Sequence, residues 1–168
     1  MHRRIALGLF MAASSGSFLI AESSFAQQSL KDQLVGAWTL VSVSSKLPDG
    51  TLVWGANPVG LLVFTNSGHY STQIMRSDLP KYASNNRAQG TPEEYNAIAI
   101  GSIANFGTYT VNEENKTFTI SYDGSTFPNR KGAKETRPFV IEGDQLRITN
   151  PAPSTGGESS QQVYRRAK

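Results

Sequence analysis

Short strand-like runs separated by turn residues constrain this chain more than any other feature. Three turn signals each follow a run of apolar and β-branched residues: 66–68 (Asn-Ser-Gly), 112–116 and 142–144 (Glu-Gly-Asp). In a fourth, Pro48-Asp49-Gly50, proline presets φ and glycine accepts a positive φ. Strands joined by short turns pair antiparallel, because parallel strands need long crossovers. A long antiparallel meander must hide its edges, and closure into a barrel does so.

The expected strands flank these turns. They are residues 61–65, 69–75, 108–111, 117–122, 139–141, 146–149 and 161–166. Within one of them, Phe118, Ile120 and Tyr122 alternate with polar residues, which is the period of a strand with one buried face. Residues 150–160 are rich in Pro, Ser and Gly, so we expect a loop before the last strand.

One segment has helical spacing instead. Thr91 is followed by Pro92 and, three residues after the threonine, by Glu94, which predicts a capping box with proline at the first helical position. Residues that recur on one helical face follow: Tyr95, Ile98, Ala99, Ser102, Ile103 and Phe106. Gly107 is placed to end the helix. We expect an inserted amphipathic helix over about 92–106 that packs on the barrel wall, closes one end or forms a mobile lid.

Residues 1–26 have the pattern of a secretory signal peptide. His2-Arg3-Arg4 is the charged start, residues 5–20 are mostly apolar, and Ser24-Phe25-Ala26 puts small residues where a signal peptidase cleaves. Serines interrupt the apolar run, which leaves it shorter than the ~20 residues of a membrane span. We therefore expect residues 27–168 to be a single domain, periplasmic or secreted, with no stable membrane span after signal removal.

Composition excludes several kinds of site. The 168-residue chain has no Cys, so it has no disulfide, thiol nucleophile or cysteine-based metal centre. A net charge of +3 without a long Lys/Arg run argues against nucleic-acid binding. The sequence contains no nucleophile elbow, phosphate loop or dinucleotide fingerprint. We assign no catalytic residue and expect no cofactor and no metal, while the oligomeric state stays open.

Several segments resemble the lipocalin-like domain family of bacteria and fungi. Residues 34–38 contain Gly36-Ala37-Trp38, the Gly-x-Trp that opens lipocalin barrels. Further similar blocks follow in the same order, at 58–65, 68–71, 73–76, 90–95, 106–109 and 125–129. The resemblance covers 34–166 and implies an all-β fold. That fold is an antiparallel up-and-down lipocalin-like barrel of the calycin type, with about eight strands around a space for one small ligand. It also implies that Trp38 stacks with Arg165 or Arg166 where the barrel closes.

Residues 69–76 hold the densest group of candidate ligand contacts. On a strand, His69, Ser71 and Gln73 share one face and the residues between them share the other. Both faces are mixed, so the stretch alone leaves open which of them lines the barrel. The resemblance favours the face of His69, because these residues belong to the similar blocks. The alternative is that His69 caps the turn after Gly68 from the surface.

The remaining candidate ligand contacts are Arg76, Tyr109, Tyr122, Phe127 and Asn129. The aromatic side chains either line a cavity or form plain core. Arg76, together with Asp78, either holds a ligand carboxylate or forms a pair at the rim, where an exposed pair contributes little stability.

Three functions fit these features. The first is an exported protein that binds a small hydrophobic molecule in the barrel cavity. The second is an isomerase or cyclase acting on a hydrophobic substrate, with His69 as general acid and base. The third is an envelope interaction or inhibitor module with a filled barrel. The absence of enzyme signatures in the sequence favours the first.

The signal-peptide pattern predicts that the mature protein begins at Gln27 or within a residue or two of it. N-terminal sequencing of the exported protein measures this directly. Intact residues 1–26 recovered in the membrane fraction would instead identify an uncleaved anchor.

Overall fold

Residues 28–168 are described by the structure, a computed structural model, and they form a closed eight-stranded antiparallel barrel. The predicted signal peptide lies outside the described residues. The strands are β1 (Gly36–Val43), β2 (Val59–Phe64), β3 (His69–Met75), β4 (Ser102–Asn112), β5 (Thr117–Ser125), β6 (Lys134–Glu142), β7 (Gln145–Asn150) and β8 (Ser160–Arg166). Each strand pairs with the next in the chain, and β8 pairs with β1, so the predicted up-and-down barrel is confirmed.

The predicted turns lie between paired strands. Gly68 and Gly143 have φ of 82° and 60°, so glycine suits both positions because other residues are strained there. Residues 151–159 form the predicted loop between β7 and β8. The Pro48-Asp49-Gly50 turn lies in the β1–β2 connection, next to an isolated bridge between Lys46 and Leu52.

One end of the barrel is shut by a short helix and a stacked pair. Helix α1 (Leu30–Leu34) precedes β1, and Trp38 Nε1 donates a hydrogen bond to the Leu34 carbonyl at 2.8 Å. The guanidinium of Arg166 lies 4.1 Å from the centre of the Trp38 ring, which confirms the predicted stacking and assigns it to Arg166. Arg166 also donates to the carbonyls of Val35 and Gln33, at 3.1 and 2.6 Å. These bonds join the last strand to the segment that precedes the first one.

The half of the interior next to this shut end is filled by aromatic side chains. Phe64 lies 4.8 Å from Tyr109 and 5.3 Å from Phe118, by ring centres, in edge-to-face contacts. Phe139 packs on Phe118 at 5.6 Å. All four side chains are buried, so this half is solid core.

Helix α2 (Pro92–Gly101) begins as the sequence predicts and ends earlier. Thr91 and Glu94 form the predicted capping box. The helix stops at Gly101, so the prediction that it runs to about 106 is wrong. Residues 102–108 instead pair with β3 along the whole of that strand, and this ladder outweighs the local helical spacing. Gly107 lies inside β4 at an irregular pairing with β5, where a Cβ would meet the Ser121 carbonyl oxygen.

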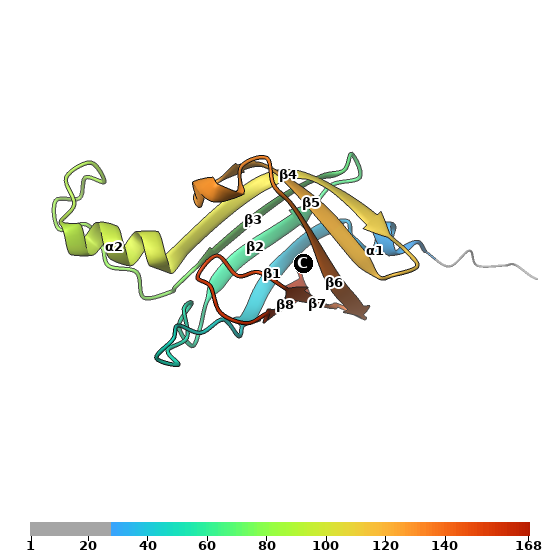
Figure 1. Cartoon of the computed structure of the whole chain (residues 1–168), viewed down its shortest axis with the longest axis horizontal. Helices are drawn as coiled ribbons and strands as arrows, with labels where there is room; N and C mark the ends of the chain where they lie inside the picture. The colour runs from blue at the N-terminus through green and yellow to red at the C-terminus, as the bar shows by residue number, and fades with distance from the viewer. Residues whose placement is uncertain (1–27) are drawn as a thin grey trace, which may run out of the picture.

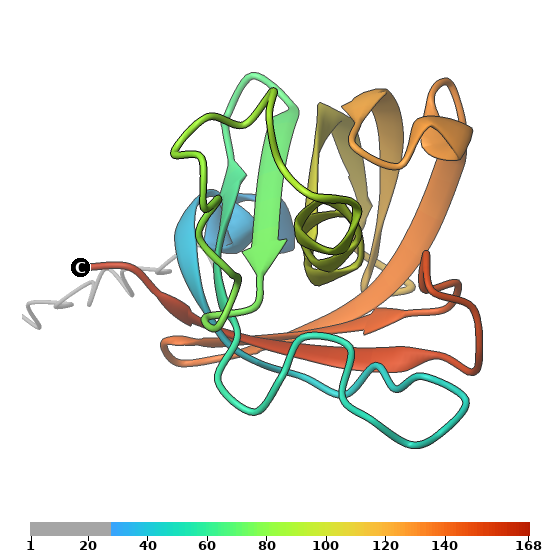
Figure 2. The ribbon, with the colours of Figure 1, turned by 90° about the vertical axis from the view of Figure 1, so that its left-hand side faces the viewer.

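The apolar face predicted for this helix is not buried against the barrel. Figure 1 shows α2 reaching out from the end of the barrel opposite α1. Figure 2, viewed from the α2 side, places α2 in front of the ring of strands and α1 behind it. On the predicted face, Tyr95 is 41% exposed and Ile98 is only partly buried, and the buried Ile103 belongs to β4 instead. Of the three alternatives for this helix, packing along the barrel wall is therefore wrong, while closing the end and forming a mobile lid stay predictions.

Trp38→Ala should destabilise the protein by roughly 3–5 kcal/mol, because the side chain is fully buried and supports the stacked Arg166. Denaturant unfolding measures the loss. Val140→Thr, on the exposed outer face of β6, is the control and should change stability by no more than about 0.5 kcal/mol. Equal midpoints for wild type and Trp38→Ala would contradict the account of the shut end.

Candidate functional site

The inner face of β3 is the opposite of the one expected from the resemblance. Tyr70 and Ile74 are buried inside the barrel, together with Thr72 between them. His69, Ser71 and Gln73 therefore lie on the outer face, and the prediction that they line the cavity is wrong. The physical reason is that Tyr70 and Ile74 bury more apolar surface than the polar alternative would, and strand register follows that gain.

His69 and its neighbours make local contacts on the outer surface. The His69 ring is exposed, and its Nδ1 forms a 3.2 Å hydrogen bond with Ser67 Oγ. Gln73 Nε2 donates to Ser71 Oγ at 2.7 Å. The surface-turn alternative for His69 thus agrees with the structure.

The other five candidates divide between core, surface and cavity. Tyr109 belongs to the aromatic core and donates to the Thr65 carbonyl at 2.8 Å. The Arg76 guanidinium donates two hydrogen bonds to the Asp78 carboxylate, at 2.8 and 2.7 Å, which agrees with the rim-pair alternative. Asn129 is exposed in the short helix η1 (Pro128–Arg130). Tyr122 bonds to the pocket residue Arg137, and Phe127 lines the space at the barrel mouth.

A polar pocket occupies the open half of the barrel. Its lining comes from the strand interiors, from η1 and from the loops at the barrel mouth: Ser45, Trp54, Thr72, Ile74, Ile103, Asn105, Arg130, Arg137, Asn150, Pro153, Ser154, Thr155 and Gln162. About 30 Å³ of it is open to the centres of water molecules, which is room for about two water-sized groups. A smaller space of about 10 Å³ lies deeper, between this pocket and the aromatic core.

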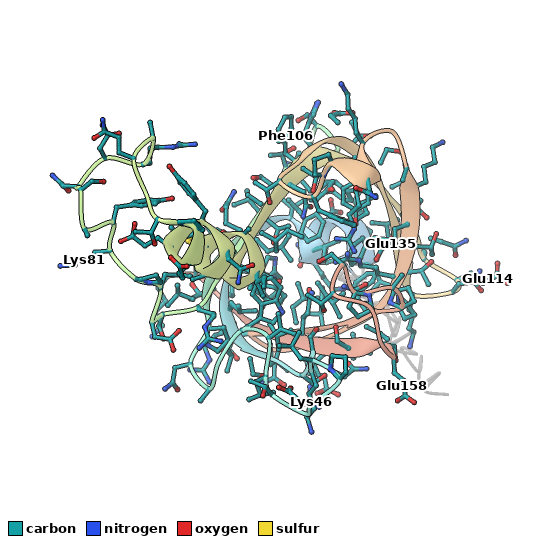
Figure 3. All side chains as sticks on the ribbon, turned by 60° about the vertical axis from the view of Figure 1, so that its left-hand side comes forward. Lys46, Lys81, Phe106, Glu114, Glu135 and Glu158 are labelled. Carbon is teal, nitrogen blue, oxygen red and sulfur yellow. The ribbon has the colours of Figure 1, made fainter. Side chains whose placement is uncertain are left out.

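Three charged side chains meet at the inner wall of the polar pocket. Arg137 Nε donates to Glu135 Oε1 at 2.7 Å, and Arg137 Nη2 donates to the Tyr122 hydroxyl at 3.1 Å. Tyr122 in turn donates to Glu135 Oε2 at 2.7 Å. Arg130 Nη2 approaches the same carboxylate oxygen at 3.5 Å, and its guanidinium lies 5.2 Å from the Tyr122 ring centre. Figure 3 shows Glu135 among the interior side chains.

The surroundings set the protonation of this cluster. Burial disfavours the charged form of Glu135, but the charge and hydrogen bonds of Arg137, aided by Tyr122 and Arg130, outweigh burial and lower its pKa. Burial raises the pKa of Tyr122 to about 12. At neutral pH the carboxylate of Glu135 is therefore ionised and Tyr122 is a neutral phenol.

Amide side chains of the polar pocket use their oxygens within the protein. Asn105 Oδ1 accepts from the Tyr70 hydroxyl at 3.1 Å, and Gln162 Oε1 accepts from the Tyr164 hydroxyl at 3.2 Å. Asn150 Oδ1 accepts from a backbone N–H at 3.2 Å. What these amides retain for a ligand is their N–H groups, so the pocket offers mainly donors.

A wider apolar groove adjoins the polar pocket at the barrel mouth. This mouth groove has a volume of about 310 Å³ and is lined by Leu47, Trp54, Ala99, Ile100, Ser102, Ile103, Thr126, Phe127, Ser154 and Thr155. It shares four of these residues with the polar pocket: Trp54, Ile103, Ser154 and Thr155. The two spaces are thus neighbours along these shared residues, with charged side chains at the polar pocket and mostly apolar ones at the mouth groove.

Sequence reasoning missed the charged cluster because the strand that carries it begins earlier than expected. Only residues 139–141 were predicted as strand, whereas β6 begins at Lys134. Phe139 faces inward, and counting back by two residues from it places Arg137 and Glu135 on the same face. That alternation was the available signal. Val140 is also apolar, so the three predicted strand residues alone do not show which of them face the barrel interior.

Residues 28–168 contain no group of three or more His, Asp or Glu side chains placed to hold a metal ion. None of the helices in this range is long and apolar enough to cross a membrane.

A closed antiparallel barrel with one shut end and one open, polar-lined end defines a calycin-type architecture. The family model of the lipocalin-like domain matches residues 35–167, and the chain belongs to this family. A comparison with curated proteins finds no match. Among solved structures, a chain described as "REP1-NXSQ fatty acid transporter" is 10% identical, with 81% of this chain and 97% of that chain covered and a TM-score of 0.37. So low a TM-score supports no argument about function.

Stability should fall at acid pH through Glu135. Because its pKa in the folded protein is below the ordinary 4.5, ionised Glu135 stabilises the fold above that pH, and this stabilisation is lost as the pH falls through the lowered value. Glu135→Gln should be less stable at pH 7 and should lose less stability between pH 5 and more acid conditions.

Denaturant unfolding at a series of pH values measures both effects. Glu142→Gln is the matched control, because Glu142 is exposed, and it should keep the wild-type pH dependence. Parallel curves for wild type and Glu135→Gln would contradict the assigned pairing.

Proposed function

We propose that the protein is an exported binding protein for a small hydrophobic molecule, held at the open end of the barrel. The observation that carries this proposal is that the mouth groove lies directly beside the polar pocket, with four lining residues in common. Ligand sites in proteins are typically apolar concavities with a few placed polar groups, and this arrangement has both. The apolar part of the ligand lies against Trp54, Ile103 and Phe127, and its polar end enters the pocket.

The distribution of space favours a ligand at the mouth rather than one enclosed in the centre. The aromatic core fills the half next to α1, and the polar pocket has room for only a few atoms. Most of the ligand must therefore occupy the mouth groove, where Ala99 and Ile100 at the end of α2 form part of the wall. In this proposal the end of α2 contacts the bound ligand.

Export rests on the sequence of residues 1–26, which has the charged start, apolar run and small residues of a signal peptide. A periplasmic or secreted location follows from that pattern and forms part of the proposal.

The enzyme alternative loses its general base in this geometry. His69 is exposed on the outer face of β3, so it does not reach a molecule held inside the barrel. A general base must lie within hydrogen-bond reach of the proton that it removes.

The filled-barrel alternative has one observation in its favour, the small volume of the polar pocket. In that case the mouth groove would be incidental, and neutral apolar compounds would not bind. The two alternatives therefore differ in a measurable property of the groove.

Ala99→Trp should block binding by filling the mouth groove with an indole ring. Titration with Nile red, a neutral dye whose emission rises in apolar sites, should show saturable binding to wild type and at least about a tenfold loss in the variant. Ala88→Trp is the matched control, because Ala88 is exposed and does not line the groove. Native mass spectrometry of the freshly purified protein adds a search for a co-purified molecule. No saturable dye binding together with no co-purified molecule would favour the filled-barrel module.

A further inference from the structure

We propose that the natural ligand carries a single carboxylate, which the polar pocket binds through Arg137 and Arg130 while the apolar chain lies in the mouth groove. This inference rests on the proposed function and adds the chemical class of the ligand's polar end. Three independent features of the pocket support it: its unbalanced charge, its excess of donors and its size.

The charge of the buried cluster does not balance. Arg130 and Arg137 carry two positive charges and Glu135 carries one negative charge, and their side chains are only 11%, 9% and 13% exposed. Neighbouring phenols supply no compensating charge at neutral pH, because burial raises the pKa of Tyr122 and of Tyr164 to about 12. A buried charge without a partner is costly, so one anionic group placed in the pocket would stabilise the cluster.

The hydrogen-bond donors of the polar pocket also favour a carboxylate. Among the described residues, Arg137 donates through Nε and Nη2 but has no hydrogen-bond partner for Nη1. Thr72 Oγ1, a hydroxyl that can donate or accept, lies buried in the pocket wall without a partner. Asn105 and Gln162 have used their oxygens and present N–H groups. A ligand that enters this pocket must therefore supply acceptors, and a carboxylate supplies two oxygens with up to four acceptor sites.

The size and the net charge distinguish a carboxylate from larger anions. The pocket has about 30 Å³ open to water centres, which corresponds to about two water-sized groups and suits two carboxylate oxygens. A phosphate monoester has three terminal oxygens and carries about −1.5 to −2 charge at pH 7, more than the single excess positive charge. A carboxylate is planar and carries one negative charge, so it fits both the volume of the pocket and its excess charge.

The test compares ligands with the same ten-carbon chain and different head groups: decanoic acid, 1-decanol and decyl phosphate. Affinities are measured at pH 7.5 by isothermal titration calorimetry with the mature protein. Decanoic acid should bind at least about tenfold more tightly than either 1-decanol or decyl phosphate. Equal affinities for the acid and the alcohol would overturn the carboxylate assignment and leave the proposed function intact. Failure of all three ligands to bind would refute the proposed function itself.

Two substitutions test the charge argument within the same titration. Arg130→Met leaves the Arg137–Glu135 pair balanced, so the preference for the acid over the alcohol should fall about tenfold while the alcohol binds as before. Arg130→Lys keeps the charge and should retain most of the preference, which separates lost charge from altered packing. Arg147→Met, on the outer face of β7, is the control and should behave as wild type. An unchanged acid preference in Arg130→Met would contradict the assignment of the excess charge.

Discussion

The ladder between β1 and β8 closes the barrel, and the stacking of Arg166 on Trp38, with 4.1 Å between the guanidinium and the ring centre, holds its end. The same arginine donates to the carbonyls of Gln33 and Val35, so the end of β8 is attached to the segment that precedes β1. Trp38 in turn donates to the carbonyl of Leu34. Without the β1–β8 pairing that this contact supports, the first and last strands would both be sheet edges, and an open edge exposes unpaired backbone groups.

This shut end also determines where a ligand can bind. The aromatic core around Phe64 fills the neighbouring half, so the remaining space lies at the opposite end, beneath the mouth loops and α2. Polar side chains there face inward because strand alternation puts them there, and they bond to one another around Arg137. Because the cluster keeps an excess positive charge and free donors, it is suited to recognise one end of a ligand.

The sequence predicted the meander, the turns and the Trp38 contact because each follows from local residue chemistry or from the family resemblance. The face of β3 was not predictable locally, since polar and apolar residues occur on both sides of the strand. The predicted end of α2 was wrong for a different reason. Residues 102–106 keep helical spacing, but in the structure they pair with β3. Arg137 was missed because the alternation that places it inside the barrel extends back from Phe139 and was not followed far enough.

The most direct test of the account uses the indole N–H signals of the two tryptophans, because Trp54 lines the open end and Trp38 closes the other. Two-dimensional ¹H–¹⁵N NMR spectra are recorded while decanoic acid is added to the labelled protein. The account predicts a saturable shift of the Trp54 indole signal with little change at Trp38, whose N–H is bonded to Leu34. A shift at Trp38 with an unmoved Trp54 signal would contradict a ligand site at the open end.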